Sequence, residues 1–282
     1  MKRFLSSLVA LALVISVASQ AKAQPSYLYT TFDVPGATDT FALGINDSGQ
    51  IVGYYREDTG GPVYAVHGFL LDDQGNYATL DAPGAAVTVA MGINATGQIV
   101  GAYGYGDFTD HGFLLDQGNY STLDAPGATY TEAFGINASG QIVGFYLAAG
   151  GRHGFLLDQG SYTTVDVPDS PLTEAFGINA SGLIVGIDDD EHGFLLDQGS
   201  YTSLDVSGAV RTEAYGINDA GQIVGRYYVG PQAFLLDQGG YTTLNVFGAI
   251  SASASGINNS GQIVGFYVDG NGTHGFLATP VP

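Results

Sequence analysis

The chain contains no cysteine and no tryptophan among its 282 residues. Without cysteine it forms neither a disulfide nor a thiolate-based metal site, so packing and backbone pairing must stabilise the fold. Thiolate catalysis is excluded for the same reason. Without tryptophan, the 18 tyrosines and 15 phenylalanines are the side chains available for stacking on a ligand.

Basic residues are also scarce, and three of the seven lie in the first 23 residues. Lys2 and Arg3 precede an apolar run over residues 4–18, which is followed by Ala21-Lys22-Ala23. This order is typical of a secretory signal peptide. We therefore predict a signal peptide over residues 1–23 and a single domain over 24–282, exported to the periplasm or beyond the cell.

The remaining chain would carry four arginines, no lysine and all 27 acidic residues, a net charge of 4 − 27 = −23. Such a surface repels nucleic acid and anionic lipid. No second apolar run is long enough to span a bilayer. We expect a monomer that binds neither nucleic acid nor membrane, with cations, basic partners and neutral glycans left as ligands.

A repeated phrase dominates what the chain does contain. Gly-Ile-Asn is followed each time by Ile-Val-Gly and then by a Phe-Leu run, and it begins at Gly44, Gly92, Gly135, Gly177, Gly216 and Gly256. Each copy holds four short segments rich in β-branched and aromatic residues, separated by turn residues. A period near forty with four strands per unit is typical of propeller blades. The sequence predicts an all-β, six-bladed β-propeller with almost no helix.

The turns and the chain ends agree with this fold. Asn137-Ala-Ser-Gly140 has an Asn suited to an Asx turn, and Asp158-Gln159-Gly160-Ser161 suits a tight hairpin. Residues 27–35 match the last strand of a unit, whereas the sixth repeat stops after His274-Gly-Phe-Leu277 without that strand. We predict that the N-terminal strand pairs with the last blade and closes the ring.

The phrase Gly-Ile-Asn-x-x-Gly-Gln-Ile-Val-Gly, followed by His-Gly-Phe-Leu, resembles the extracellular HAF repeat of bacterial secreted proteins. The resemblance covers nearly the whole chain after residue 23, although five repeats read His-Gly-Phe and the fifth reads Gln232-Ala-Phe. It implies export and a repeat fold. The family has largely no assigned activity, so the resemblance implies no catalytic residues.

The five histidines occupy the same position in five of the repeats. They are His67, His111, His153, His192 and His274. One per blade spreads them around a ring, too far apart to share a metal ion. We interpret them as side chains that fix the start of the third strand by a hydrogen bond.

Three consecutive repeats place a carboxylate before Gly-Ile-Asn, namely Glu132, Glu174 and Glu213. If this strand lines the channel, the three would gather at one side of its mouth, where they could hold a hard cation or act as acid and base in glycoside cleavage. The alternative is that each is solvated or paired locally, as Arg211 could pair with Glu213.

A second acidic group fills a very short link in the fourth repeat and comprises Asp188, Asp189, Asp190 and Glu191. Adjacent acids on a turn usually face water. Calcium is the ion whose ligand preference fits an irregular, oxygen-rich loop. We predict modest calcium stabilisation through this group or through the three glutamates.

The repeats differ most in two kinds of link, those between the second and third strands and those before Gly-Ile-Asn. In an up-and-down blade both emerge on one face, so binding is expected there. The candidate residues are Asp39, Tyr105, Asp107, Tyr130 and Arg211. The leading hypothesis is an exported binding or scaffold module for a glycan or extracellular polymer. The alternative is a polysaccharide hydrolase or lyase that uses the three glutamates.

Overall fold

A computed structural model describes residues 26–61, 63–105, 110–189 and 191–281. The described residues form β-strands, turns and links, with no helix among them. None of them therefore belongs to a helix that could cross a membrane. The predicted signal peptide lies outside the described residues.

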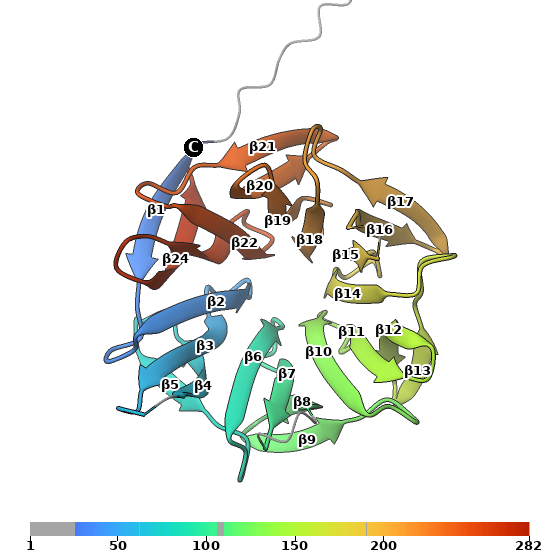
Figure 1. Cartoon of the computed structure of the whole chain (residues 1–282), viewed down its shortest axis with the longest axis horizontal. Helices are drawn as coiled ribbons and strands as arrows, with labels where there is room; N and C mark the ends of the chain where they lie inside the picture. The colour runs from blue at the N-terminus through green and yellow to red at the C-terminus, as the bar shows by residue number, and fades with distance from the viewer. Residues whose placement is uncertain (1–25, 62, 106–109, 190, 282) are drawn as a thin grey trace, which may run out of the picture.

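Each repeat contributes strands to a four-stranded unit, and Figure 1 shows these units arranged around a central opening. The inner strands are β2 (Asp39–Ile45), β6 (Val87–Ile93), β10 (Tyr130–Ile136), β14 (Thr173–Ile178), β18 (Thr212–Ile217) and β22 (Ser251–Ile257). The second strands are β3 (Ile51–Asp58), β7 (Ile99–Gly104), β11 (Ile142–Ala148), β15 (Ile184–Asp188), β19 (Ile223–Tyr228) and β23 (Ile263–Val268).

The third strands are β4 (Tyr64–Leu71), β8 (Asp110–Asp116), β12 (Gly151–Asp158), β16 (Gly193–Asp197), β20 (Pro231–Asp237) and β24 (Thr273–Pro280). The outer strands are β5 (Tyr77–Leu80), β9 (Asn119–Leu123), β13 (Ser161–Thr164), β17 (Ser200–Leu204), β21 (Gly240–Leu244) and β1 (Tyr27–Phe32). Within a unit, neighbouring strands are antiparallel. The units of the first two repeats are joined into one sheet by a single parallel pair, Val66 with Val87.

The N-terminal strand β1 is the outer strand of the sixth repeat. It pairs antiparallel with β24 over its whole length, from Tyr27 opposite Pro280 to Phe32 opposite Gly275. The predicted pairing between the N-terminal strand and the final Phe-Leu strand is therefore present. Its effect is to cover the outer edge of β24.

The hydrophobic core lies between units rather than inside them. In one cluster, Val52 of the first repeat packs with Ala90 and Phe113 of the second. In another, Val264 of the sixth repeat packs with Ala42 and Phe69 of the first. Each unit buries its faces only against its neighbours, which is why the repeats must stack to be stable.

The glycines of the repeated phrase permit close backbone contact. A Cβ added to Gly53 of Ile-Val-Gly would lie 1.9 Å from the carbonyl oxygen of Phe41. One added to Gly44 of Gly-Ile-Asn would lie 2.9 Å from the carbonyl oxygen of Met91, on the inner strand of the next repeat. The first glycine allows the two inner strands of a unit to pair, and the second allows inner strands to converge on the axis.

The asparagine of Gly-Ile-Asn joins neighbouring repeats as well as forming its predicted turn. Asn137 Oδ1 accepts from the backbone N–H of Ser139 at 3.1 Å and of Gln141 at 3.0 Å, as an Asx turn requires. Its Nδ2 donates to the carbonyl oxygen of Asn179 in the next repeat at 3.1 Å. The same bond recurs from Asn46, Asn94, Asn179 and Asn218, and Asn258 returns it to the carbonyl of Asn46.

Candidate functional site

Two faces can be distinguished by their links. The turn face carries the Asn-x-x-Gly turns and the tight hairpins before the outer strands. The variable face carries the links between the second and third strands and the links before the inner strands. The two kinds of link are hydrogen-bonded to one another: Thr38 N–H donates to the carbonyl of Arg56 at 2.8 Å, and Val210 N–H donates to the carbonyl of Tyr228 at 3.1 Å. The predicted sharing of one face by the variable links is thus confirmed by backbone hydrogen bonds.

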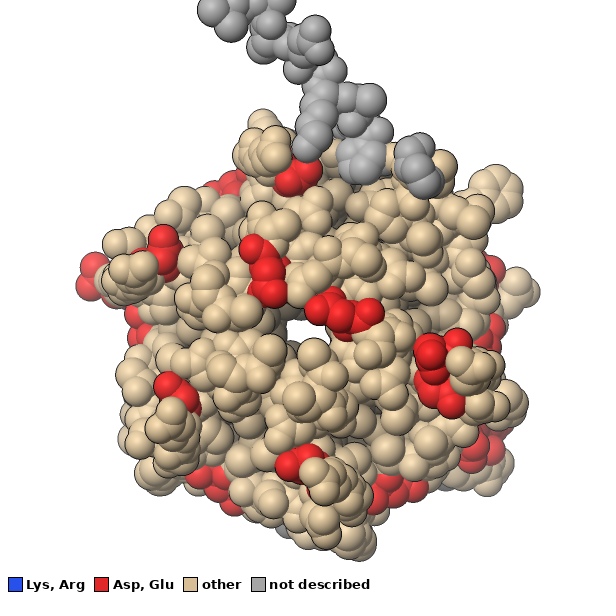
Figure 2. All heavy atoms as spheres, turned by 180° about the vertical axis from the view of Figure 1, so that it is seen from behind, with Lys and Arg blue, Asp and Glu red and all other residues tan. Residues whose placement is uncertain are grey.

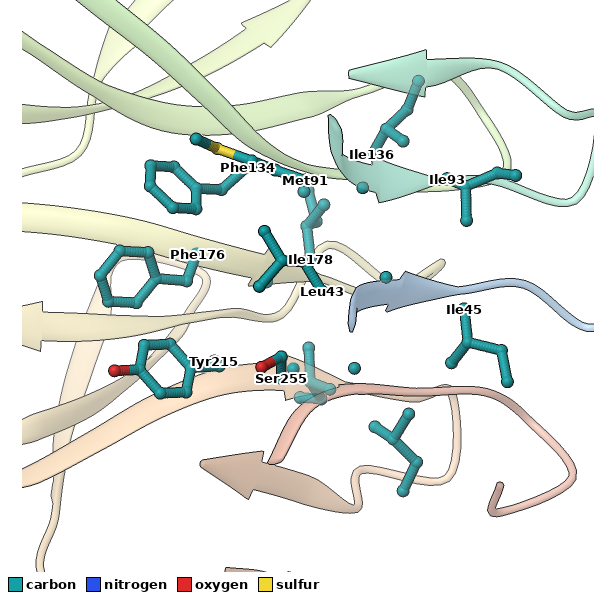
Figure 3. Close-up of a pocket in the computed structure, with 18 of the residues that line it drawn as sticks. Leu43, Ile45, Met91, Ile93, Phe134, Ile136, Phe176, Ile178, Tyr215 and Ser255 are labelled. Carbon is teal, nitrogen blue, oxygen red and sulfur yellow. The ribbon is translucent and has the colours of Figure 1, made fainter. Parts of the chain in front are cut away.

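A central cavity of about 250 Å³ runs along the axis between the inner strands. Every inner strand has a β-bulge just before the glycine of Gly-Ile-Asn, for instance between Ala133 and Gly135. A bulge redirects the unpaired residue, here towards the axis. These six residues all line the cavity: Leu43, Met91, Phe134, Phe176, Tyr215 and Ser255. Figure 3 shows Phe134, Phe176 and Tyr215 together at one end of it and Ile45, Ile93 and Ile136 at the other.

The opening on the turn face is smaller and polar. The six asparagines line it together with Asp47, Asp219 and Asn259. Asn259 Nδ2 donates to Asp47 at 2.9 Å and to Asp219 at 2.8 Å, so both carboxylates are occupied in linking repeats. Figure 2 shows acidic side chains beside the central opening, and no described Lys or Arg is visible on that face.

The three predicted glutamates do not line the cavity, and the structure gives them three different environments. Glu213 is the most enclosed, with a side chain 6% exposed. Arg211 Nη2 approaches it at 2.6 Å and Arg226 Nη2 at 2.9 Å. Tyr215 also donates to it at 2.5 Å. Two guanidinium groups and a phenol satisfy this carboxylate, so its role is structural, and the predicted Arg211–Glu213 pair is confirmed.

Glu174 pairs with Arg152, which belongs to the preceding repeat. The guanidinium of Arg152 also lies 4.6 Å from the ring centroid of Phe145. A cation held between a carboxylate and an aromatic face is well fixed. Glu174 therefore joins two repeats through a partly exposed ion pair.

Glu132 has no arginine within ion-pair distance in the described structure; its hydrogen-bond partner is the Tyr130 hydroxyl. Burial raises the pKa of Glu132 to about 7, and the charges of Asp110 and Glu174 add to the rise. The hydrogen bond from Tyr130 and the charge of Arg152 act in the opposite direction. With a pKa of about 7, the Glu132 carboxyl is able to exchange a proton near neutral pH.

The remaining predicted binding residues have separate tasks. Asp39 Oδ1 accepts from the backbone N–H of Thr273 at 3.1 Å, which joins the first and sixth repeats. Tyr105 is 51% exposed on the variable face and packs edge-on against Tyr103 and His111. Asp107 lies outside the described residues. The structure does not bring Asp39, Tyr105 and Arg211 into contact with one another.

The acidic link of the fourth repeat is held by a hydrogen bond to His192 and an ion pair with Arg211. Asp188 Oδ1 accepts from the N–H of His192 at 3.0 Å, and Arg211 lies 3.6 Å from Glu191. Asp190 lies outside the described residues. No three His, Cys, Asp or Glu side chains in the part of the chain that is described converge as a metal site. The calcium site remains a prediction.

The histidines have the structural role that their position predicted. Each Nδ1 bonds the aspartate at the end of the outer strand of its own unit at 2.6–3.0 Å, in the pairs His67–Asp81, His111–Asp124, His153–Asp166, His192–Asp205 and His274–Asp33. In the fifth repeat Gln232 replaces the histidine, and Asn245 replaces the aspartate. A neutral pair thus stands where the other repeats have an ionisable one.

Sequence reasoning missed Arg152, Arg226 and Asp110, the residues that distinguish the three glutamates. Arg226 could have been found from hairpin register, because it is directly opposite Glu213 in the β18–β19 pair. Arg152 and Asp110 lie on neighbouring strands or repeats, where a single sequence gives no distance.

No family model matches the chain, and no curated protein matches it. Solved structures match its fold. Virginiamycin B lyase from Staphylococcus aureus has 11% identity and a TM-score of 0.51, with 86% of this chain and 82% of that chain covered. The Aleuria aurantia lectin, solved with Fucα1-6GlcNAc, has 14% identity and a TM-score of 0.52, with 90% and 98% covered. The β-propeller domain of the trilobed protease from Pyrococcus furiosus has 9% identity and a TM-score of 0.50, with 86% and 94% covered.

At these identities the likeness shows the fold alone. The chain is an all-β protein built from four-stranded blades, and its structural neighbours are β-propellers.

Proposed function

We propose that the chain is an exported binding or scaffold module whose six repeats form one closed, six-bladed propeller. Three observations support closure: β1 pairs with β24, Val264 packs against the first repeat, and the asparagine bonds return from Asn258 to Asn46. The Pyrococcus domain is described as having an open velcro topology, so closure is argued from this chain's own contacts. The signal-like residues 1–23 support export.

The distribution of exposed apolar side chains supports binding through the variable face. Of the nine large apolar side chains that are exposed among the described residues, seven lie in or beside its links: Val63, Tyr64, Tyr105, Val210, Val229, Phe247 and Ile250. The other two, Leu28 and Val281, lie on β1 and near the C-terminus. Phe247 is 97% exposed. Apolar side chains that are more than half exposed and lie on one face favour an interaction surface there.

The ligand class follows from charge and from these side chains. A net charge of −23 after residue 23 disfavours anionic polymers. Exposed Tyr and Phe rings stack on the apolar faces of sugars. A neutral glycan or extracellular polymer fits both, and the Aleuria lectin shows that a protein of similar fold binds a glycan.

The test is binding of the protein lacking residues 1–23 to an array of neutral and anionic glycans and polymers. Phe247→Ser combined with Ile250→Ser should weaken retention of the neutral ligands at least tenfold. Leu28→Ser is the matched control, because Leu28 is 66% exposed but lies on the outer strand β1. Retention of anionic polymers alone, or equal losses in both variants, would overturn the proposal.

One observation supports the alternative, a polysaccharide hydrolase or lyase. Burial raises the pKa of Glu132 to about 7, so this carboxyl exchanges a proton near neutral pH, and it interacts electrostatically with Glu174. A carboxyl that titrates near the working pH suits a general acid or base. Release of reducing or unsaturated sugar ends that is lost in both Glu132→Gln and Glu174→Gln would support it. Binding without turnover would favour the module.

A further inference from the structure

The axial cavity has room for an aromatic ring. Its volume of about 250 Å³ exceeds the roughly 150 Å³ of an engineered apolar cavity that holds benzene. Phe134 and Phe176 form part of its wall, with ring centroids 4.9 Å apart. Arg226 also lines the cavity, and its guanidinium pairs with the Glu213 carboxylate, which it shares with Arg211. The cavity therefore accepts an apolar body.

The cavity extends towards the level of Glu132. Ser253 lines it and occupies in the sixth repeat the position that Glu132 occupies in the third. A chain of ring contacts links the two regions, because Phe145 stacks with both Tyr130 and Phe134 at 5.8 Å. Tyr130 is the hydrogen-bond partner of Glu132, and Phe134 lines the cavity.

Negative charge is in excess around Glu132. Glu132 interacts electrostatically with Asp110 of β8 and Glu174 of β14, against the single guanidinium of Arg152. Three carboxylates less one guanidinium leave two negative charges when all are ionised. A cation placed there gains from all three carboxylates and from the faces of the nearby rings.

We propose that the cavity and the Glu132 carboxylate together bind an organic ammonium ion, with its apolar body in the cavity and its charge beside Glu132. This site is separate from the exposed apolar side chains on which the proposed polymer binding rests. It distinguishes the molecule from a plain glycan module, because its ligand must combine a positive charge with an apolar group.

The proposal has a definite pH dependence. The groups that face Glu132 are Asp110, Tyr130, Arg152 and Glu174. Burial holds the pKa of Glu132 at about 7, so the carboxyl is largely protonated at pH 6 and ionised at pH 8. A bound ammonium ion favours the ionised form. Binding therefore releases a proton near pH 7 and becomes tighter between pH 6 and pH 8.

Calorimetry with three probes of similar size tests the charge requirement: benzylammonium, benzyl alcohol and benzoate. At pH 8 benzylammonium should bind at least tenfold tighter than benzyl alcohol, and benzoate should not bind. Titrations at pH 7 in two buffers of different ionisation enthalpy should report proton release. Glu132→Gln should abolish the release and the preference, whereas Asp73→Asn should retain both, because Asp73 is an exposed acid on the turn face.

A second variant tests the cavity without changing any charge. Ser255→Phe places a ring where a small side chain lines the cavity, and it should remove benzylammonium binding while leaving the thermal midpoint close to that of the parent. Equal affinity for benzylammonium and benzyl alcohol, or unchanged binding in both Glu132→Gln and Ser255→Phe, would overturn the proposal. Polymer retention by Ser255→Phe would be unaffected, so the two proposals fail separately.

Discussion

The two faces of this propeller use the same repeats for opposite purposes. On the turn face, the asparagine of every Gly-Ile-Asn makes the same bonds, including one to the next repeat at 3.1–3.2 Å. On the variable face, matched positions hold unlike residues, such as Glu132 and Ser253. The uniform face connects the repeats by the same bond in every copy, whereas the irregular face connects them at single places, such as Arg152 with Glu174.

The irregular face also carries the ion pairs between arginine and glutamate. All four arginines after residue 23 lie near it, on or just before strands β3, β12, β18 and β19. Three of them pair with Glu174 and Glu213, whereas the third glutamate, Glu132, accepts a hydrogen bond from Tyr130 and has no arginine partner among the described residues. The comparison teaches that repeats agree where they build structure, and that a carboxyl without an arginine partner at a variable position is the place to seek function.

The largest effect should come from removing the strand that covers the last blade. Deleting residues 27–34 exposes the edge of β24 along its full length, and it removes Val34 from the core cluster between the sixth and first repeats. We expect aggregation or loss of cooperative unfolding, measured by light scattering and thermal denaturation. An unchanged midpoint would contradict the proposed closure through β1.

The next prediction concerns the turn face. Asn137→Ala removes the two backbone hydrogen bonds of the Asx turn and the bond to the carbonyl of Asn179, which keeps the N–H of Gly182 as a donor. We expect a loss of about 3 kcal/mol in the free energy of unfolding by urea. Asn119→Ala, in an exposed hairpin turn on the same face, is the control and should change stability little. Similar losses in the two variants would remove the special role of the Gly-Ile-Asn position.

These contacts show how far the sequence alone could reach. The period and the turn residues predicted the strands, because those signals are local. The pairing of Tyr27–Phe32 with β24 was predictable because the sixth repeat lacks the strand that the N-terminal segment matches. The bond from Asn137 to Asn179 spans 42 residues, and the bulge that turns Phe134 to the axis depends on pairing geometry. Single-sequence patterns carry neither. The three glutamates could be found because they share one position in aligned repeats. Their different partners could not be found, because those partners lie on other strands or repeats.

Glu132 gives a prediction of opposite sign to most substitutions. Its raised pKa means that the folded chain favours the protonated carboxyl, so ionisation costs stability as pH rises from its ordinary value of 4.5 through about 7. Glu132→Gln keeps an acceptor for Tyr130 and carries no charge. It should stabilise the protein by up to about 3 kcal/mol at pH 8 and by almost nothing at pH 4. Urea unfolding at both pH values measures this, and a gain independent of pH would contradict it.

Calcium tests whether the acidic link of the fourth repeat does more than face solvent. At a hundred times its dissociation constant, a ligand that binds only the folded state adds about 2.7 kcal/mol. A shift of the melting midpoint in calcium, absent in Asp189→Asn, would support the predicted site. A shift no larger than in sodium of matched ionic strength would end the metal hypothesis. Arg152 and Arg226 already satisfy Glu174 and Glu213, so Glu174→Gln should not alter any calcium effect.

The smallest effect should come from His274, which ties β24 to both Asp33 and Asp269. Partial burial alone would lower its pKa, but the hydrogen bond and charge of Asp33, with the charge of Asp269, raise it. Its contribution is therefore fully present below the unfolded pKa near 6.5 and is lost as pH rises through the folded pKa. His274→Gln combined with Asp33→Asn reproduces the neutral pair of the fifth repeat, Gln232 and Asn245. The double variant should be slightly less stable than the parent at pH 5.5 and equal to it at pH 8.5, because the charged pair contributes only while the imidazole is protonated.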